Sequence, residues 1–169
     1  MIFKINNNFD IIFIQELSWT TLKSIPSPSN YEGDSLAEII NYSNWLTFTR
    51  EPDIMNNCPR VVMFINIRLS SFHFSFCKDV INHRDILLTP FFNNGNIFWL
   101  MNIYSDSSYS VIKYLKNTEF NIQNLLVMTG DFNIQNCLWD PLFNHHSSIS
   151  DNLFASADSF NLSLVYLNN

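Results

Sequence analysis

Two acidic residues stand directly after short apolar runs. Glu16 follows residues 10–15 (DIIFIQ), and Asp131 follows residues 125–130 (LLVMTG). Because ligand sites of α/β sheets lie outside strand ends, we expect the two carboxylates to lie close together. Mg²⁺ takes one or two carboxylates together with water and substrate phosphate oxygens. The pair therefore predicts a site for a hard cation and a phosphate-containing substrate.

Tyr104 and Asn133 belong to the same predicted site. Asn133 can donate a hydrogen bond to a phosphate or orient a neighbour. Tyr104 ends the apolar run 97–104 and can direct its phenol at the same place. Gly130 allows a sharp turn or a close approach to a ligand. Each residue also has a simpler interpretation, because strand-end glutamates are usually solvated and Gly-Asp-x-Asn is a common turn sequence.

The elements that must position these residues are mainly strands. Alternating apolar residues and β-branched runs predict strands at 10–15, 45–49, 60–67, 72–76, 86–88, 97–104 and 125–129, the first and the last of them buried. A further strand starts at 163–166, and residues 93–96 form a hairpin loop. Residues 18–44 have loop chemistry, with a helical turn or two at 35–40.

Two helices accompany the strands. Apolar spacing predicts one over 108–116, with caps offered by residues 106–108, and a second that begins at Ser148 or Ser150 and extends to Leu164. Strands outnumber helices, which favours mixed sheets covered by helices.

Length and charge limit the classes of function. The 169 residues suggest one domain, and 9 basic against 15 acidic residues give a net charge of −6. This charge excludes a strongly basic protein that wraps nucleic acid, but not a nuclease that collects carboxylates around a metal.

Three scattered cysteines, Cys58, Cys77 and Cys137, indicate reduced thiols in an intracellular protein, nuclear or cytoplasmic. The start of the chain lacks the apolar segment of a signal peptide, so we expect no secretion. The most apolar stretch, 86–104, is interrupted at 93–96 and is not expected to enter a membrane.

Three segments together resemble the endonuclease/exonuclease/phosphatase superfamily. Residues 10–16 are similar to its metal-binding strand, residues 102–104 (NIY) to its Asn-x-Tyr strand end, and residues 129–133 (TGDFN) to its Gly-Asp-Phe-Asn motif. Residues 130–133 followed by 138–140 (LWD) are most similar to the apurinic-type endonuclease of non-LTR (LINE-like) retrotransposons. The resemblance covers about residues 8–166, within a single partial domain over 1–169.

The resemblance implies an α/β (α+β) fold, a two-sheet mixed β-sandwich flanked by helices. It also implies a hydrolase that cleaves DNA phosphodiesters with Mg²⁺ or Mn²⁺. Glu16 would bind the metal, and Asp131 would position or activate the attacking water. Asn133 would hold the phosphate and the site geometry, and Tyr104 would contact the scissile phosphate. An intact element would add a flanking reverse-transcriptase polypeptide as partner.

The sequence departs from this family at both ends. Relatives begin with a strand that carries an Asn facing the site, whereas only ten residues precede Ile11 here. Relatives end with a Ser-Asp-His strand, and this tripeptide does not occur. We therefore expect an incomplete sandwich with weakened or no activity, and we assign the histidine role to no residue. Asp106 also stands where relatives often have Asn or Pro.

Two alternatives stay open at this point. One is a catalytically inactive binding or interaction module, a relic of the enzyme. The other is a phosphomonoesterase of the same superfamily, since fold alone does not decide the substrate. The adjacent His145 and His146 lie in a polar loop, where solvated side chains are more common than metal ligands.

Overall fold

The computed structural model describes residues 9–16, 23–26, 35–38, 44–50, 59–75, 80–139, 142–144, 147–163 and 165. In chain order the elements are β1 (Ile11–Gln15), β2 (Lys23–Pro26), β3 (Ser35–Glu38), β4 (Trp45–Thr49), β5 (Val61–Asn66), the 3-10 helix η1 (Ile67–Phe72), β6 (Ile86–Asn93), β7 (Asn96–Tyr104), α1 (Ser110–Asn117), β8 (Leu125–Asp131) and α2 (Ser148–Ser159).

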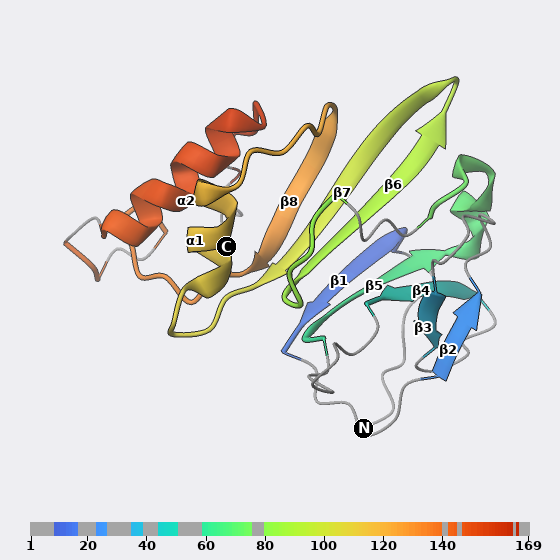
Figure 1. The fold of residues 1–169 in the computed structure, drawn as a ribbon, viewed down its shortest axis with the longest axis horizontal. Coiled ribbons are helices and arrows are strands. Elements are labelled where there is room, and N and C mark those ends of the chain that lie inside the picture. Colours follow the sequence, from blue (N-terminus) through green and yellow to red (C-terminus); the bar gives the residue numbers. More distant parts are fainter. Residues whose placement is uncertain are drawn as a thin grey trace.

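Two three-stranded sheets face each other, which confirms the predicted α+β sandwich (Figure 1). The first sheet is antiparallel, in the order β1-β5-β4. The second has the order β6-β7-β8, with β6 antiparallel and β8 parallel to β7. Strands β2 and β3 form a separate antiparallel pair.

Alternation along the central strands builds the core between the sheets. Val61, Met63 and Ile65 of β5 share one apolar cluster with Leu100 and Tyr104 of β7. The intervening residues of β5 join a cluster on the outer face of the first sheet. All six residues of β5 are buried, as expected for a strand covered on both faces.

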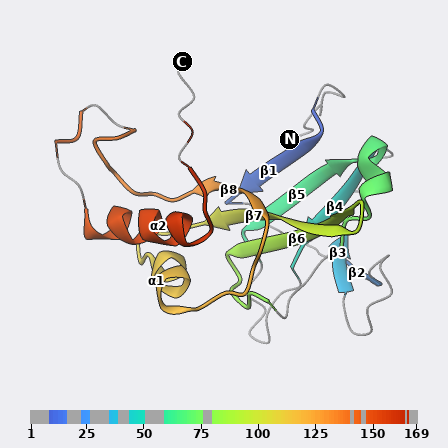
Figure 2. The ribbon, with the colours of Figure 1, turned by 90° about the horizontal axis from the view of Figure 1, so that it is seen from above.

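Helices α1 and α2 cover the outer face of the second sheet, opposite the first sheet (Figure 2). Ile112 of α1 and Leu153 of α2 pack in one cluster with Met101 and Ile103 of β7. In the part of the chain that the structure describes, no helix has the length and apolar character to cross a membrane.

The helix caps differ from the predicted ones. Tyr109 is the N-cap of α1 and makes no side-chain capping bond, although residues 106–108 form the turn before it. Ser147 caps α2, because its hydroxyl accepts from the Ser150 amide. The second helix ends at Ser159, before the predicted Leu164, which lies outside the described residues.

Several predicted elements are wrong. Residues 23–26, predicted as loop, form strand β2, and residues 35–38 form strand β3 and no helical turn, because the two segments pair with each other. Strand β1, predicted to be buried, is only half-buried along its length. Residues 72–75 form no strand: Phe72 ends η1, and His73 takes a left-handed conformation with φ 48°. The aromatic alternation there reflects packing, since Phe72 and Phe74 both contact Phe91.

Two predicted strands are longer than expected. Strand β6 continues to Asn93 because its whole length pairs with β7. Strand β8 continues to Asp131 but is not buried throughout, since Leu126 is 49% and Val127 39% exposed. Strand β8 lies at the edge of its sheet, which explains this exposure. The predicted strand start at 163–166 falls largely outside the described residues.

Candidate functional site

The carboxyl ends of β1, β7 and β8 meet at one end of the sandwich. The arrowheads of β1 and β8 point to this end in Figure 1. The Tyr104 hydroxyl, at the end of β7, donates to Oε1 of Glu16 at 3.0 Å, across 88 positions of sequence. Tyr104 is also the register partner of Asp131 at the end of β8. We call Glu16, Tyr104, Asp131 and Asn133 the strand-end cluster.

The parallel register also decides which way Asp131 points. Paired residues of neighbouring strands project from the same face of a sheet. Because Tyr104 faces the first sheet, Asp131 shares that face. The side chains predicted from separate segments are therefore brought together where the two sheets meet.

Asn102 joins the two sheets by hydrogen bonds beside the cluster. It is fully buried, and its amide nitrogen donates to the carbonyls of Ile14 at 3.0 Å and Val62 at 2.9 Å. Its side-chain oxygen accepts from the Gln15 amide. The Asn of the Asn-x-Tyr segment therefore joins β7 to β1 and β5, and so supports the placement of Glu16 against Tyr104.

Asn133 ties the end of β8 back to β7. Its amide nitrogen donates to the carbonyl of Ser105 at 2.7 Å, and its backbone N–H donates to Oδ1 of Asp131 at 3.1 Å. The Ser105 N–H donates in turn to the Asp131 carbonyl. Asn133 thus holds the geometry of the cluster, and its predicted contact with a phosphate stays a prediction.

Two cluster residues have left-handed backbone conformations. Glu16 has φ 57° and Asn133 has φ 49°. Asn adopts this region readily, whereas for Glu it costs about 1–2 kcal/mol. Such costs are concentrated at functional sites, where the surrounding structure maintains them. His73 and Tyr109, outside the cluster, have the same left-handed conformation, so the backbone at Glu16 does not by itself distinguish this end of the sandwich.

The Leu-Trp-Asp segment is structural over its described part. The Trp139 indole N–H donates to the Ile134 carbonyl at 2.8 Å, and its ring packs on Phe154 of α2. These contacts hold the loop after β8 against the second helix. Asp140 lies outside the described residues.

Arg60 is a site residue that the sequence analysis missed. Its Nε donates to Oδ1 of Asp85 at 2.7 Å, and its Nη2 donates to Oδ2 of Asp85 at 2.5 Å and of Asp106 at 3.1 Å. The guanidinium carbon lies 4.4 Å from the centroid of the Tyr104 ring. These partners come from two segments far from Arg60 in sequence, the residue before β6 and the end of β7 with the turn after it, so no local motif signals the role of Arg60.

Burial, hydrogen bonds and nearby charges shift the pKa of Tyr104 and of Asp106. Burial raises the pKa of the Tyr104 phenol above its ordinary value, and its hydrogen bond to Glu16 raises it further. The phenol is therefore a proton donor at neutral pH. Hydrogen bonds from Ser108, followed by those from Arg60, lower the pKa of Asp106 to about 2.

The donor types of the cluster match a hydrated Mg²⁺ rather than a fully protein-bound ion. Within the described ranges, no three His, Cys, Asp or Glu side chains gather closely enough to hold a metal. Mg²⁺ needs only one or two carboxylates, with waters and phosphate oxygens completing its coordination. The cluster contains two carboxylates, Glu16 and Asp131, and metal binding by them stays a prediction.

The two described histidines lie away from the cluster. His73 ends η1, and the His83 ring packs on Tyr114 while its Nδ1 accepts from the Asp85 N–H. His145 and His146 fall outside the described residues. The described part of the chain thus places no imidazole beside Tyr104 or Asp131.

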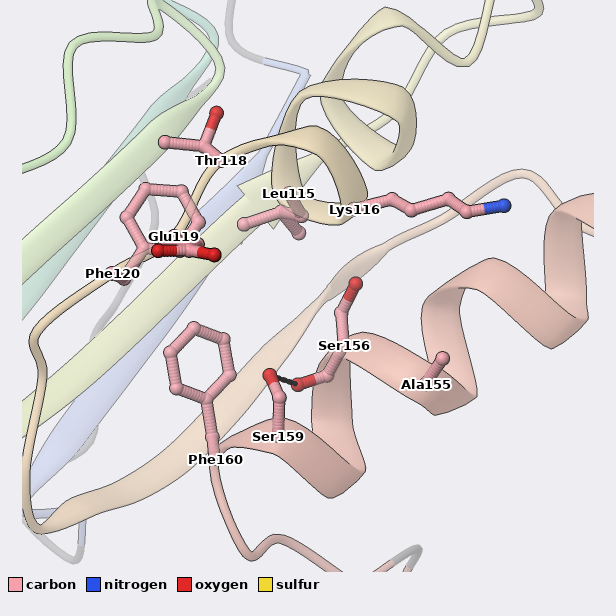
Figure 3. A pocket seen from close by; sticks show the side chains of 9 residues that line it. All are labelled: Leu115, Lys116, Thr118, Glu119, Phe120, Ala155, Ser156, Ser159 and Phe160. Carbon is pink, nitrogen blue, oxygen red and sulfur yellow. Dashed lines mark hydrogen bonds between the residues drawn. The ribbon is translucent and has the colours of Figure 1, made fainter.

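A hollow of about 290 Å³ lies between α1 and α2, away from the strand-end cluster (Figure 3). Its serine hydroxyls donate to helix carbonyls, Ser156 to Asn152 and Ser159 to Ser156, and Lys116 donates to the Asn152 side chain. Phe120 and Phe160 stack at its other end. Because these polar groups are hydrogen-bonded within and between the two helices, we place the candidate site at the strand ends.

No family model, curated protein or solved structure matches the chain. The strand-end cluster and the family resemblance of its motifs are therefore the support for a function.

Proposed function

We propose that this chain is the endonuclease domain of a LINE-like retrotransposon protein, a Mg²⁺- or Mn²⁺-dependent phosphodiesterase that cleaves DNA with low turnover. The observation that carries this proposal is the meeting of Tyr104 with Glu16 and Asp131, from three strands far apart in sequence. The family resemblance implied this group of residues. An intracellular location and a reverse-transcriptase partner remain predictions.

Each cluster residue has a chemical task in this proposal. Glu16 would hold the metal, which when bound neutralises charge on the phosphate oxygens. Asp131 would orient the attacking water and accept its proton. Asn133 keeps Asp131 in place through its backbone N–H.

The protonated Tyr104 phenol would donate to a phosphate oxygen. Because the hydroxyl has one proton, this contact replaces its hydrogen bond to Glu16. The Glu16 oxygen is then released from the phenol and becomes available as a ligand. In this proposal the hydrogen bond between the two side chains is therefore broken when Tyr104 donates to the phosphate.

We expect low turnover because the described residues offer the cluster few free cationic groups. The described residues supply no imidazole to the cluster, and the Arg60 guanidinium is engaged by Asp85 and Asp106. Fixed donors aimed at developing charge are usually the largest contribution to catalysis, so a site with few of them is slow.

Nicking of supercoiled plasmid tests the proposal. Wild-type protein should nick slowly with Mg²⁺ or Mn²⁺ and not with EDTA. Asp131→Ala should reduce the rate about a hundredfold or more, because it removes the proton acceptor. Glu16→Gln should raise the Mg²⁺ concentration needed for half-maximal activity. Asp158→Asn, an exposed change on α2, is the matched control and should leave the rate unchanged.

Equal nicking by wild type and Asp131→Ala would refute the assignment of the site. An inactive binding module is the second candidate, favoured by the engaged Arg60 and by the absence of a described imidazole from the cluster. A folded chain that binds DNA with a steep salt dependence but does not nick it would support this candidate. Hydrolysis of a small phosphomonoester without nicking would instead indicate a phosphatase.

A further inference from the structure

The Arg60 guanidinium lies between the two sheets, against the face of the Tyr104 ring. We propose that Arg60 is a positioning residue that holds the Tyr104 phenol in its reactive orientation. This inference rests on the proposed phosphodiesterase function and adds a residue that the family resemblance did not supply.

Two carboxylates fix the orientation of Arg60. Asp85, immediately before β6, takes two parallel hydrogen bonds from the guanidinium, and its side chain is 1% exposed. Asp106, two residues after β7, accepts a third bond. Such paired charge-assisted bonds restrict the plane as well as the position of the guanidinium. Arg60, the residue before β5, is therefore held rigidly by the residue before β6 and by the turn after β7. We call the guanidinium held in this way the Arg60 platform.

The platform restrains the phenol at its ring face. The 4.4 Å between the guanidinium carbon and the ring centroid is within the range of cation–π attraction. Glu16 restrains the same side chain at its hydroxyl. When the hydroxyl leaves Glu16 for a phosphate oxygen, the contact with Arg60 remains. Arg60 thus keeps the ring in place during the exchange of hydrogen-bond partners.

The edge of Arg60 formed by Nε and Nη2 already donates to Asp85 and Asp106. In this proposal Arg60 acts on the reaction through the Tyr104 ring, which its guanidinium faces.

The mobility of the Tyr104 ring gives a distinctive measurement. Arg60 contacts the ring face, and Glu16 restrains only the hydroxyl. Removal of the guanidinium should therefore increase the motion of the Tyr104 ring. Tyr114 of α1, which packs on His83 and Phe120, is the internal reference for a general loosening of the fold.

The experiment combines NMR with nicking kinetics. Tyrosines carrying ¹³C in the ring are examined in the full chain by ¹³C relaxation, and Tyr104→Phe assigns the Tyr104 signal. Arg60→Gln should give a more mobile Tyr104 ring and a kcat for nicking lower by roughly tenfold or more, with KM for DNA nearly unchanged. Arg60→Lys should recover only part of the ring order and of kcat, because an ammonium cannot form the fork.

Arg68→Gln is the matched control. Arg68 also pairs with an aspartate, Asp10 at 2.7 Å, at the opposite end of β1 from Glu16. This variant should change neither the motion of the Tyr104 ring nor kcat. An Arg60→Gln protein with the Tyr104 ring motion and kcat of this control would overturn the proposal.

A second variant covers a failure to fold. Arg60→Gln leaves the buried Asp85 carboxylate without its main partner, which can unfold the chain. The double variant Arg60→Gln, Asp85→Asn replaces the ion pair with two neutral amides and should show the same increase in Tyr104 ring motion. If wild type does not nick DNA, the proposed function fails separately, and the mobility of the Tyr104 ring in wild type and variants decides whether Arg60 holds the phenol.

Discussion

At the scale of single residues, Asp106 shows how one carboxylate organises the approach to the site. Its Oδ1 accepts from both the backbone N–H and the hydroxyl of Ser108, while its Oδ2 accepts from Arg60. The first pair closes the turn before α1, and the other bond secures the platform under Tyr104. The residue that departs from the family pattern is thus built into the local structure.

Asp106 makes stability depend on pH in the acid range. Its pKa in the folded chain is about 2, below the usual 3.8, chiefly because Ser108 donates to it. A lowered pKa contributes stability above pH 4 that is lost as the pH falls towards 2. Urea denaturation at pH 5, 4, 3 and 2 should show a steeper loss for wild type than for Asp106→Asn.

Ser108→Ala should have an intermediate slope, because it removes one of the two Ser108 hydrogen bonds and leaves the backbone bond in place. Parallel curves for wild type and Asp106→Asn would contradict the assignment of this acid-range stability to Asp106.

At the scale of elements, the site depends on how closely β8 approaches β7. A Cβ atom on Gly130 would lie 2.0 Å from the Ile103 carbonyl oxygen, which is backbone and cannot move aside cheaply. Gly130 is therefore needed for strand packing, rather than for the turn or the ligand approach that the sequence suggested. The next residue along β8 is Asp131, so the same close approach positions the carboxylate.

Gly130→Ala should destabilise the chain by about 3 kcal/mol, the upper part of the usual cost of overpacking, and should abolish nicking. Gly95 is a useful comparison because its φ is +78° but a Cβ there meets nothing within 4 Å. Gly95→Ala should cost only about 1 kcal/mol and leave nicking intact. Equal losses in chemical denaturation would show that crowding against Ile103 is not the cause.

At the scale of the whole molecule, we expect the exposed edge of the second sheet to govern self-association. Strand β8 pairs with β7 on one side, and within the described chain no strand pairs with its other side. Leu126 and Val127 are exposed along it. An exposed apolar edge is a template for pairing with another chain.

Leu126→Lys should therefore reduce self-association without lowering the free energy of unfolding by more than about 0.5 kcal/mol, the usual range for surface changes. Light scattering at increasing protein concentration measures the first effect and urea denaturation the second. Lys is effective at such edges because pairing would bury its charge. Equal scattering by variant and wild type would show that this edge does not drive association.

The elements with regular periodicity could be predicted from the sequence. The strands at β1, β4, β5 and β7 and helix α1 follow local alternation or helical spacing, and their bounds agree with the prediction to within two residues. Residues 72–76 show the limit of this approach. Their aromatic alternation imitates a strand, but the left-handed His73 ends η1 there and the phenylalanines pack between the sheets.

The candidate side chains could be named from the amino-acid sequence, since Tyr104 ends an apolar run, Glu16 and Asp131 directly follow one, and Asn133 comes two residues later. Their contacts could be known only from the folded chain. The register of β8 beside β7, the Asn102 bonds across the sheets and the Arg60 platform all join segments far apart in sequence. Periodicity and turn chemistry are local properties, whereas these contacts depend on which distant surfaces fit together when the sheets pack.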